Sequence, residues 1–323
     1  MLSLPHGAST MTLAISSSLR LGALLGLLLG PAGCSIRTYA LRATADALSG
    51  TGGGYAEEGD PQLAREAAPF GLKTMEQILQ QVPGHIGLHL ALARGFTQYA
   101  YAFVHQDADR AEDRSLQAAQ AGWLRARRLY LRGRDHALAG LGLRCPGISE
   151  ALRSGDATRR DAALACVTKK DVPLLYWAGA AWALAVSTAR DQPDLLGDLP
   201  TVEAMMRRAL ALDESYDEGA LHEFFVAYEA SRPGVDGSAA ARKHLERALQ
   251  LSGGHRLGPL LSYAEGVLVQ QQNKKEFVAL LQRVLAADVL RDDPAWRRNR
   301  LANLIHQDRA RWLLGRLELL FAE

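Results

Sequence analysis

The chain has 323 residues, of which 48% are hydrophobic and 22% charged, and its formal net charge at pH 7 is only +2. This length provides a sizeable core for one large domain, for two small ones, or for a repeat array that folds as one unit. The small net charge excludes nothing by itself, but it gives no support to a nucleic-acid partner, which would need a concentrated basic face. Abundant Ala and Leu with few β-branched residues favour an all-α fold.

The N-terminus contains the sharpest local signal. Arg20 precedes the apolar run 21–29, which is too short to span a bilayer as a helix but suits the hydrophobic part of a signal peptide. Small residues then lead to Cys34, a pattern that resembles a bacterial lipobox, although Pro31 stands where an aliphatic residue is usual. We expect a lipoprotein signal peptide at 1–33, cleaved before an acylated Cys34. The alternative is an ordinary secretory signal followed by a chance cysteine.

The segment after the cysteine is expected to connect the lipid to a folded body. Residues 34–59 are assigned as a lipidated N-terminus and tether, and residues 60–323 as a helical repeat domain. The glycine-rich stretch 49–54 is interpreted either as a flexible linker or as a turn after a short helix over 36–48.

Breakers and apolar periodicity predict the further helices in chain order. Asp60 and Pro61, as N-cap and first-turn proline, predict a helix that ends near Gln81. An Arg-Gly-Arg-Asp segment at 132–135 predicts a turn, and Pro200 predicts the start of another helix. The predicted helices up to that point cover about 60–81, 84–105, 109–132 and 172–189, with a less regular stretch at 144–171.

Two cysteines lie beyond the signal. Cys145 and Cys166 are separated by 21 positions, and in an exported protein they would suit a disulfide that pins a loop. The alternative is a pair of free buried thiols. No histidine pair at ligand spacing accompanies them, so we expect neither a metal site nor a cofactor.

A degenerate repeat runs through the C-terminal part of the chain. Segments 207–212, 246–251 and 282–287 share a pattern of charged or polar residues followed by Ala, Val and Leu, at spacings of about 39 and 36 residues. Between them, residues 221–228 place apolar side chains at i, i+3, i+4 and i+7, which is one face of a helix. One helix pair cannot bury such a stripe alone, so neighbouring pairs must stack. We predict degenerate tetratricopeptide-like helix pairs stacked in a compact solenoid.

Three aromatic residues on one predicted helix are candidate ligand contacts. Tyr176, Trp177 and Trp182 lie among Ala and Gly, and small residues can leave room beside large rings. One interpretation is the wall of an apolar cavity, in which Trp contacts an amphiphilic ligand. The other is ordinary core packing.

Polar residues further along are candidates of the same kind. Tyr263 and Glu265 lie near a predicted helix start, where they would contact a ligand or partner, or only cap and pack. His222 precedes Glu223, but the further ligands of a metal site are missing, so a structural or cavity-lining role is expected.

Motifs that would indicate an enzyme are missing. The glycine stretch 50–54 lacks the Lys-Ser/Thr pair and the strand–helix context of a phosphate-binding loop, and no Gly-x-Ser-x-Gly elbow occurs. We therefore expect a binding protein that is not an enzyme.

Short motifs in a fixed order extend from the middle of the chain to its end. They are LYWAGAAW at 175–182, DLP at 198–200 leading into 205–212, GALHEF at 219–224, ARKHLERAL at 241–249, SYAE at 262–265, RLANL at 300–304 and RARWLL at 309–314. Their order and spacing, from the lipobox through Phe321, resemble the TatT family, the T component of tetratricopeptide-associated TRAP transporters.

The resemblance implies a function that composition and periodicity do not. It implies a periplasmic lipoprotein that forms a homotrimer, is held at a membrane by its lipid anchor, and binds the extracytoplasmic solute-binding P component. It also implies a channel-like cavity for apolar or amphiphilic ligands. The alternative is a general tetratricopeptide-like scaffold of the cell envelope with no link to transport.

Overall fold

The computed structural model describes residues 37, 39–50, 53–189, 193–232 and 234–322, and within them it is all-helical, without a strand. The predicted signal peptide at 1–33 and the predicted acylation site Cys34 lie outside the described residues. Among the helices of the described part, not one combines the length and the apolar character that crossing a membrane requires.

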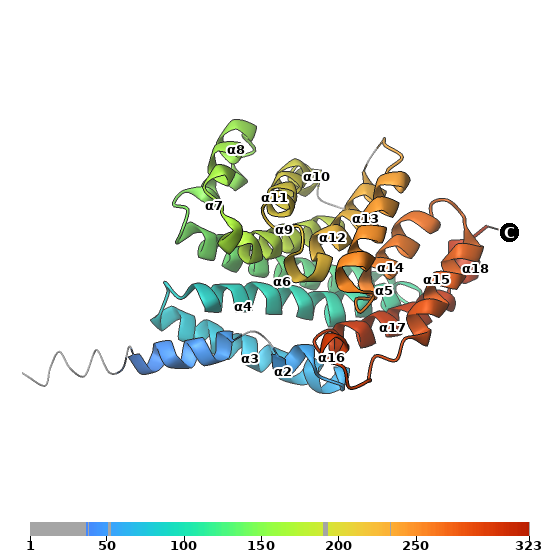
Figure 1. Ribbon diagram of the computed structural model, residues 1–323, viewed down its shortest axis with the longest axis horizontal. Helices are drawn as coiled ribbons and strands as arrows, with labels where there is room; N and C mark the ends of the chain where they lie inside the picture. The colour runs from blue at the N-terminus through green and yellow to red at the C-terminus, as the bar shows by residue number, and fades with distance from the viewer. Residues whose placement is uncertain (1–36, 38, 51–52, 190–192, 233, 323) are drawn as a thin grey trace, which may run out of the picture.

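The helices follow one another with short connections (Figure 1). A first helix covers 39–49. The others are α2 (Gly53–Ala56), α3 (Pro61–Gln81), α4 (Ile86–Tyr99), η1 (Ala100–His105), α5 (Gln106–Glu112), α6 (Leu116–Gly142), α7 (Ile148–Arg153), α8 (Ala157–Ala165), η2 (Lys169–Asp171), α9 (Val172–Ser187), α10 (Pro193–Leu196), α11 (Leu199–Leu212), η3 (Tyr216–Gly219), α12 (Ala220–Ser231), α13 (Ser238–Ser252), α14 (Gly258–Tyr263), η4 (Ala264–Leu268), α15 (Lys274–Ala286), α16 (Pro294–Arg297), α17 (Arg300–Leu314) and α18 (Leu317–Leu320).

The start of α3 confirms the capping prediction. The Asp60 carboxylate accepts hydrogen bonds from the backbone N–H groups of Gln62 and Leu63, at 2.9 and 3.2 Å. Pro61 occupies the first turn, where its missing N–H leaves no hydrogen bond unmade. The helix ends at Gln81, as its breakers predict.

The predicted turn at 132–135 is wrong, because these residues lie inside the long helix α6. Gly133 is needed there for close approach to α4: a Cβ at this position would lie 2.7 Å from Thr97 Oγ1 and 3.0 Å from the Ala93 carbonyl oxygen. Glycine in a helical sequence can thus indicate tight helix packing, although local propensity alone favours a break.

Two helices are interrupted by π-helical turns. The helix that begins as α4 continues through η1 into α5, and α14 continues into η4. A π-helical turn inserts an extra residue into the helical ladder and so changes the direction of the side chains that follow it. Both turns lie where the chain approaches the interior cluster described below.

Apolar contacts divide the interior into clusters along the chain. The largest joins α4, α6–α9, α11 and α12 around Trp182. A second joins α12–α15, α17 and α18 around Phe277. A third packs helix 39–49 against α3 and α4 through Ala45. The short helix predicted over 36–48 is therefore present as helix 39–49, and it packs on the body.

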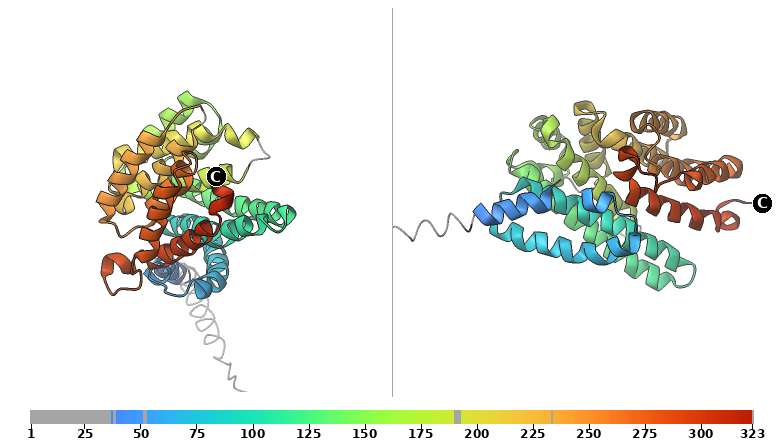
Figure 2. Two further views of the ribbon diagram at one scale, coloured as in Figure 1. Left: turned by 90° about the vertical axis from the view of Figure 1, so that its right-hand side faces the viewer. Right: turned by 60° about the horizontal axis from the view of Figure 1, so that its bottom comes forward.

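The C-terminal helices return to the N-terminal ones. Arg110 of α5 pairs with Asp308 of α17 at 2.6 Å, and Arg309 of α17 pairs with Asp109 of α5 at 2.7 Å. Figure 1 shows α17 below α5 and near α2, and the second view of Figure 2 agrees. The array of helices therefore closes through contacts between its C-terminal and N-terminal parts.

A disulfide joins Cys145, after α6, to Cys166, at the end of α8, with 6.0 Å between the Cα atoms. The closed loop contains α7 and α8, which are too short to be stable alone. The bond holds this hairpin against the end of α6.

Candidate functional site

Aromatic and charged side chains from helices far apart in the sequence meet in the interior. We call them the central cluster: Tyr101, Tyr176, Trp177, Tyr216, Glu223, Arg256, Glu265, His306 and Arg309. All of them keep some solvent-accessible surface. Burial is nevertheless the largest influence on the pKa of Tyr101, Tyr176 and His306. These side chains therefore lie deep in the helical body and are still partly accessible to solvent.

Helix α9 supplies two of the aromatic side chains of the cluster, Tyr176 and Trp177. The Tyr176 ring lies 5.2 Å from the Trp177 ring and 5.3 Å from the Tyr216 ring, measured between centroids. Small residues on the same helix allow α11 to approach, since a Cβ on Gly179 would lie 2.6 Å from Met206 Sδ. Burial raises the pKa of Tyr176, with a further contribution from Glu223, so its hydroxyl stays protonated and can both donate and accept a hydrogen bond.

Arg256 is the centre of the first charged network. Its guanidinium donates to Glu223 Oε2 at 2.8 and 3.2 Å and to Asp217 Oδ2 at 3.0 Å. Burial alone would lower the pKa of Arg256, but the two carboxylates together raise it. The arginine is therefore charged at all physiological pH values.

The backbone beside this network is strained. Asp217 and Glu218 both have left-handed conformations, with φ of 44° and 55°, which are uncommon for residues other than glycine. Asp217 is held by Arg256, and Glu218 is held by Arg298 at 2.8 Å. Strained residues of this kind often occur at functional sites, where the surrounding contacts enforce them.

Gly258 makes room for the Glu223 carboxylate. A Cβ at Gly258 would lie 2.0 Å from Glu223 Oε1 and 2.9 Å from His306 Cε1. The Nδ1 atom of His306 is buried and has no hydrogen-bond partner among the described residues. Burial lowers the pKa of His306 and the nearby Glu223 only partly opposes it, so the ring is neutral at pH 7. An unpaired polar atom in the interior is a group that a ligand can satisfy.

Arg309 forms the second charged network, next to both π-helical turns. It donates to Glu265 Oε2 of η4 and to Asp109 Oδ2 of α5, each at 2.7 Å, and its guanidinium lies 4.2 Å from the Trp312 ring centroid. Burial alone would lower the pKa of Arg309, but Glu265 and Asp109 raise it. This arginine therefore joins the two helices that contain the π-helical turns.

The structure brings together only some of the candidates that the sequence suggested. Tyr176, Trp177 and Glu265 belong to the central cluster. Trp182 is 1% exposed, donates to Asp198 Oδ2 at 2.8 Å and packs in the largest apolar cluster. Tyr263 is 2% exposed and lies in the C-terminal core. The last two side chains therefore have packing roles.

His222 lies outside the central cluster, although its neighbour Glu223 is in it. Its Nδ1 atom is 2.8 Å from His244 Nδ1, and its Nε2 atom is 3.2 Å from Glu214 Oε1. The hydrogen bond from Arg247 and, to a smaller extent, the one from His222 lower the pKa of Glu214 to about 2. This group ties the loop before η3 to α12 and α13.

Sequence reasoning missed most of the charged residues of the cluster. Arg256 and His306 lie outside the motifs quoted above, and Arg309 belongs to the RARWLL motif, which by itself indicates no role for its side chain. In the sequence, Glu223 is visible only as the neighbour of His222 and as part of the GALHEF motif. The interior position of these residues depends on the closure of the array, which no local pattern reveals.

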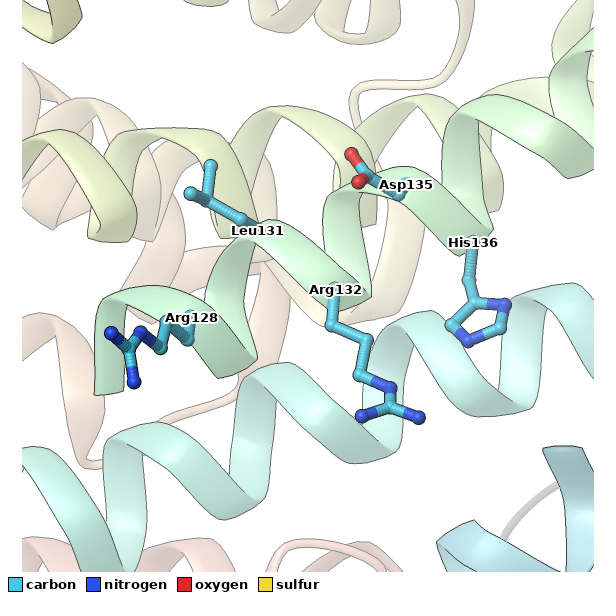
Figure 3. A pocket seen from close by; sticks show the side chains of 5 residues that line it. All are labelled: Arg128, Leu131, Arg132, Asp135 and His136. Atoms are coloured by element: carbon cyan, nitrogen blue, oxygen red, sulfur yellow. The ribbon is translucent and has the colours of Figure 1, made fainter. Parts of the chain in front are cut away.

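Two hollows lie on the surface. One, of about 550 Å³, lies along α6 and is lined by Arg128, Leu131, Arg132, Asp135 and His136. In Figure 3, Arg132 and His136 point toward the neighbouring helix α4. The second, of about 290 Å³, lies where α12 gives way to α13. Within the described part of the chain, His, Cys, Asp and Glu form no group of three or more that could hold a metal ion.

Comparison with known proteins identifies a family. The model of the TRAP transporter T-component family matches residues 57–321. A protein of Treponema pallidum (strain Nichols), described as uncharacterized, is 31% identical over 271 residues, which is 83% of this chain and 83% of the relative.

Proposed function

We propose that this protein, which belongs to the TRAP transporter T-component family, is a periplasmic lipoprotein that binds the solute-binding P component and holds an amphiphilic ligand in its interior. The family consists of accessory transport components associated with the cell envelope, not of known enzymes. We accordingly propose a binding role without catalysis.

The central cluster is the observation that carries the ligand part of the proposal. Its side chains keep accessible surface although they lie deep in the helical body. A hydrocarbon bound at this cluster would leave the buried His306 Nδ1 without a hydrogen-bond partner, which costs free energy. An amphiphile can place its tail on the Tyr176 and Trp177 rings and its polar group on the charged residues. The mixed lining therefore favours an amphiphilic ligand over a purely apolar one.

Titration with dodecanoate, followed by tryptophan fluorescence, tests the interior site. We expect dodecanoate to change the emission of the lipid-free protein, residues 35–323, and Trp177→Phe to remove most of that change. Trp296→Phe is the matched control, because Trp296 lies in α16 against His255 and outside the cluster. An unresponsive wild-type protein, or a response lost only in Trp296→Phe, would contradict the site.

The lipid anchor is proposed from the lipobox pattern alone. The small residues before Cys34, after an apolar run, support acylation of that cysteine. Cys34→Ala should move the protein from the membrane fraction to the soluble fraction of the envelope. Membrane attachment that persists in the variant would argue against this anchor.

We also propose that the helix pairs are degenerate tetratricopeptide-like repeats. Close packing of α12 against α13 supports this, since a Cβ on Gly219 would lie 3.2 Å from Ala248 Cα. A crystal structure in which successive pairs superpose by one constant rotation tests the proposal. Unrelated crossing angles from pair to pair would refute it.

The partner is tested by analytical ultracentrifugation. The lipid-free protein should sediment as a homotrimer, and as a larger species when the purified P component is added. A sedimentation coefficient unchanged by the P component at micromolar concentrations would exclude this role. It would favour instead the envelope scaffold with a different partner.

A further inference from the structure

Helix α6 has an outer face on which apolar and charged residues alternate. Leu124, Arg128, Leu131 and Asp135 recur at spacings of four, three and four residues, so they share one side of the helix. Leu124 is 40% exposed, and Leu116, two turns earlier, is 56% exposed. The hairpin of α5 and α6 projects from the body in both views of Figure 2. Leu131 is partly buried against the cluster that contains Tyr130, so this face is open to a partner mainly at Leu116 and Leu124.

The charge on this helix is unbalanced. Its sequence contains five arginines and a single acidic residue, Asp135. Arg132 is paired with Glu76, and Asp135 is bonded to Arg134 and Arg153. Asp135 thus cannot compensate the remaining arginines of the outer face.

Two arginines on this helix carry a positive charge that no acidic side chain of the described residues neutralises. Arg125 and Arg128 are exposed, and no carboxylate of the described residues forms an ion pair with either. Arg128 also lines the hollow of about 550 Å³, beside Leu131 (Figure 3). Unpaired positive charge beside the exposed Leu116 and Leu124 suits a partner whose acidic residues surround an apolar side chain.

We propose that the outer face of α6, formed by Leu116, Leu124, Arg125, Arg128 and Leu131, is the docking surface for an acidic, partly apolar patch of the P component. The inference rests on the proposed function and adds to it the face and the chemistry of the contact. A second copy placed on this face about a twofold axis would set arginines against arginines, which costs free energy. A partner of opposite charge avoids this repulsion and associates faster.

Paired charge reversals test the surface. Arg125→Glu with Arg128→Glu should weaken binding of the purified P component at least about tenfold, mostly through a slower association rate. Lys275→Glu with Arg283→Glu is the matched control. It reverses two exposed charges of α15 that also lack ion pairs among the described residues. Circular dichroism should show both double variants folded, because exposed substitutions change stability little.

Surface plasmon resonance at two salt concentrations separates the outcomes. Support requires that wild type binds more weakly at high salt and that only the α6 variant loses affinity. Equal binding by wild type and the α6 variant would overturn this surface and leave the proposed function standing. Equal losses in both double variants would also overturn it, because net charge alone would then explain them. A wild-type protein that does not bind the P component would overturn both.

Discussion

Removing one carboxylate of the Arg256 network is the most direct test of the interior. Arg256 is bonded to Glu223 and Asp217, whose side chains are 20% and 50% exposed. Breaking a fully buried ion pair costs roughly 3–5 kcal/mol, whereas an exposed pair contributes about 0–1 kcal/mol. Since Asp217 stays in place and water reaches part of the site, we expect Glu223→Gln to cost about 2 kcal/mol. Asp217→Asn should cost less than about 1 kcal/mol, since Asn also tolerates a left-handed backbone.

Urea unfolding followed by far-ultraviolet circular dichroism measures both costs. Glu223→Gln should lower the midpoint clearly more than Asp217→Asn does. In an Arg256→Met background, the effect of Glu223→Gln should shrink by at least about 1 kcal/mol, because the lost charge then has no partner. If Asp217→Asn is the more destabilising variant, or if the two effects add without coupling, the interior placement of the Glu223–Arg256 pair is refuted.

Further predictions concern packing, the disulfide and pH. Gly258→Ala should lower the free energy of unfolding, measured by thermal denaturation, by about 1–3 kcal/mol, because the new Cβ would displace Glu223. The control is Gly142→Ala, since a Cβ on Gly142 would have no atom within 4 Å. Equal melting temperatures of the two variants would contradict the contact between Gly258 and Glu223. Cys145→Ser with Cys166→Ser should cost about 3 kcal/mol in urea, the value for a loop of this length, and a reductant should then have no further effect on the variant. Burial lowers the pKa of several histidines below the ordinary 6.5, so the folded state prefers their neutral form. The stability that depends on these neutral rings is complete above pH 6.5 and is lost as the pH falls below it. The free energy of unfolding should therefore decrease from pH 7 to pH 5, by up to about 1.4 kcal/mol per pH unit for each histidine. A free energy of unfolding that does not change over this pH range would contradict the prediction. These histidines are His89, His136, His222, His244 and His306.

The helix boundaries show which signals act locally. Asp60 and Pro61 determine the start of α3 through hydrogen bonds and a backbone angle that involve only their neighbours. The turn predicted at 132–135 is wrong for the opposite reason, because it depends on a distant helix. Whether Gly133 ends a helix or allows a second helix to approach depends on α4, which lies more than 30 positions earlier in the chain.

The candidate site also has features that the sequence shows and features that only the fold shows. Aromatic residues among Ala and Gly were visible as Tyr176, Trp177 and Trp182, but they lie on one helix, and its orientation decides which of them face the interior. Trp182 is on the side that packs against α6 and the loop before α11. The charged partners of the other two come from α12, the loop before α14, and α17.

The sequence by itself determined the helical class, the capped helix starts and the family resemblance, because composition, capping and motif order act over a few residues or are read directly along the chain. Only the tertiary structure decided which residues share the interior. Closure depends on ion pairs such as Arg309 with Asp109, which are 200 positions apart. Whether two residues at that separation meet depends on how all the helices between them pack, and a periodic sequence pattern does not describe that packing.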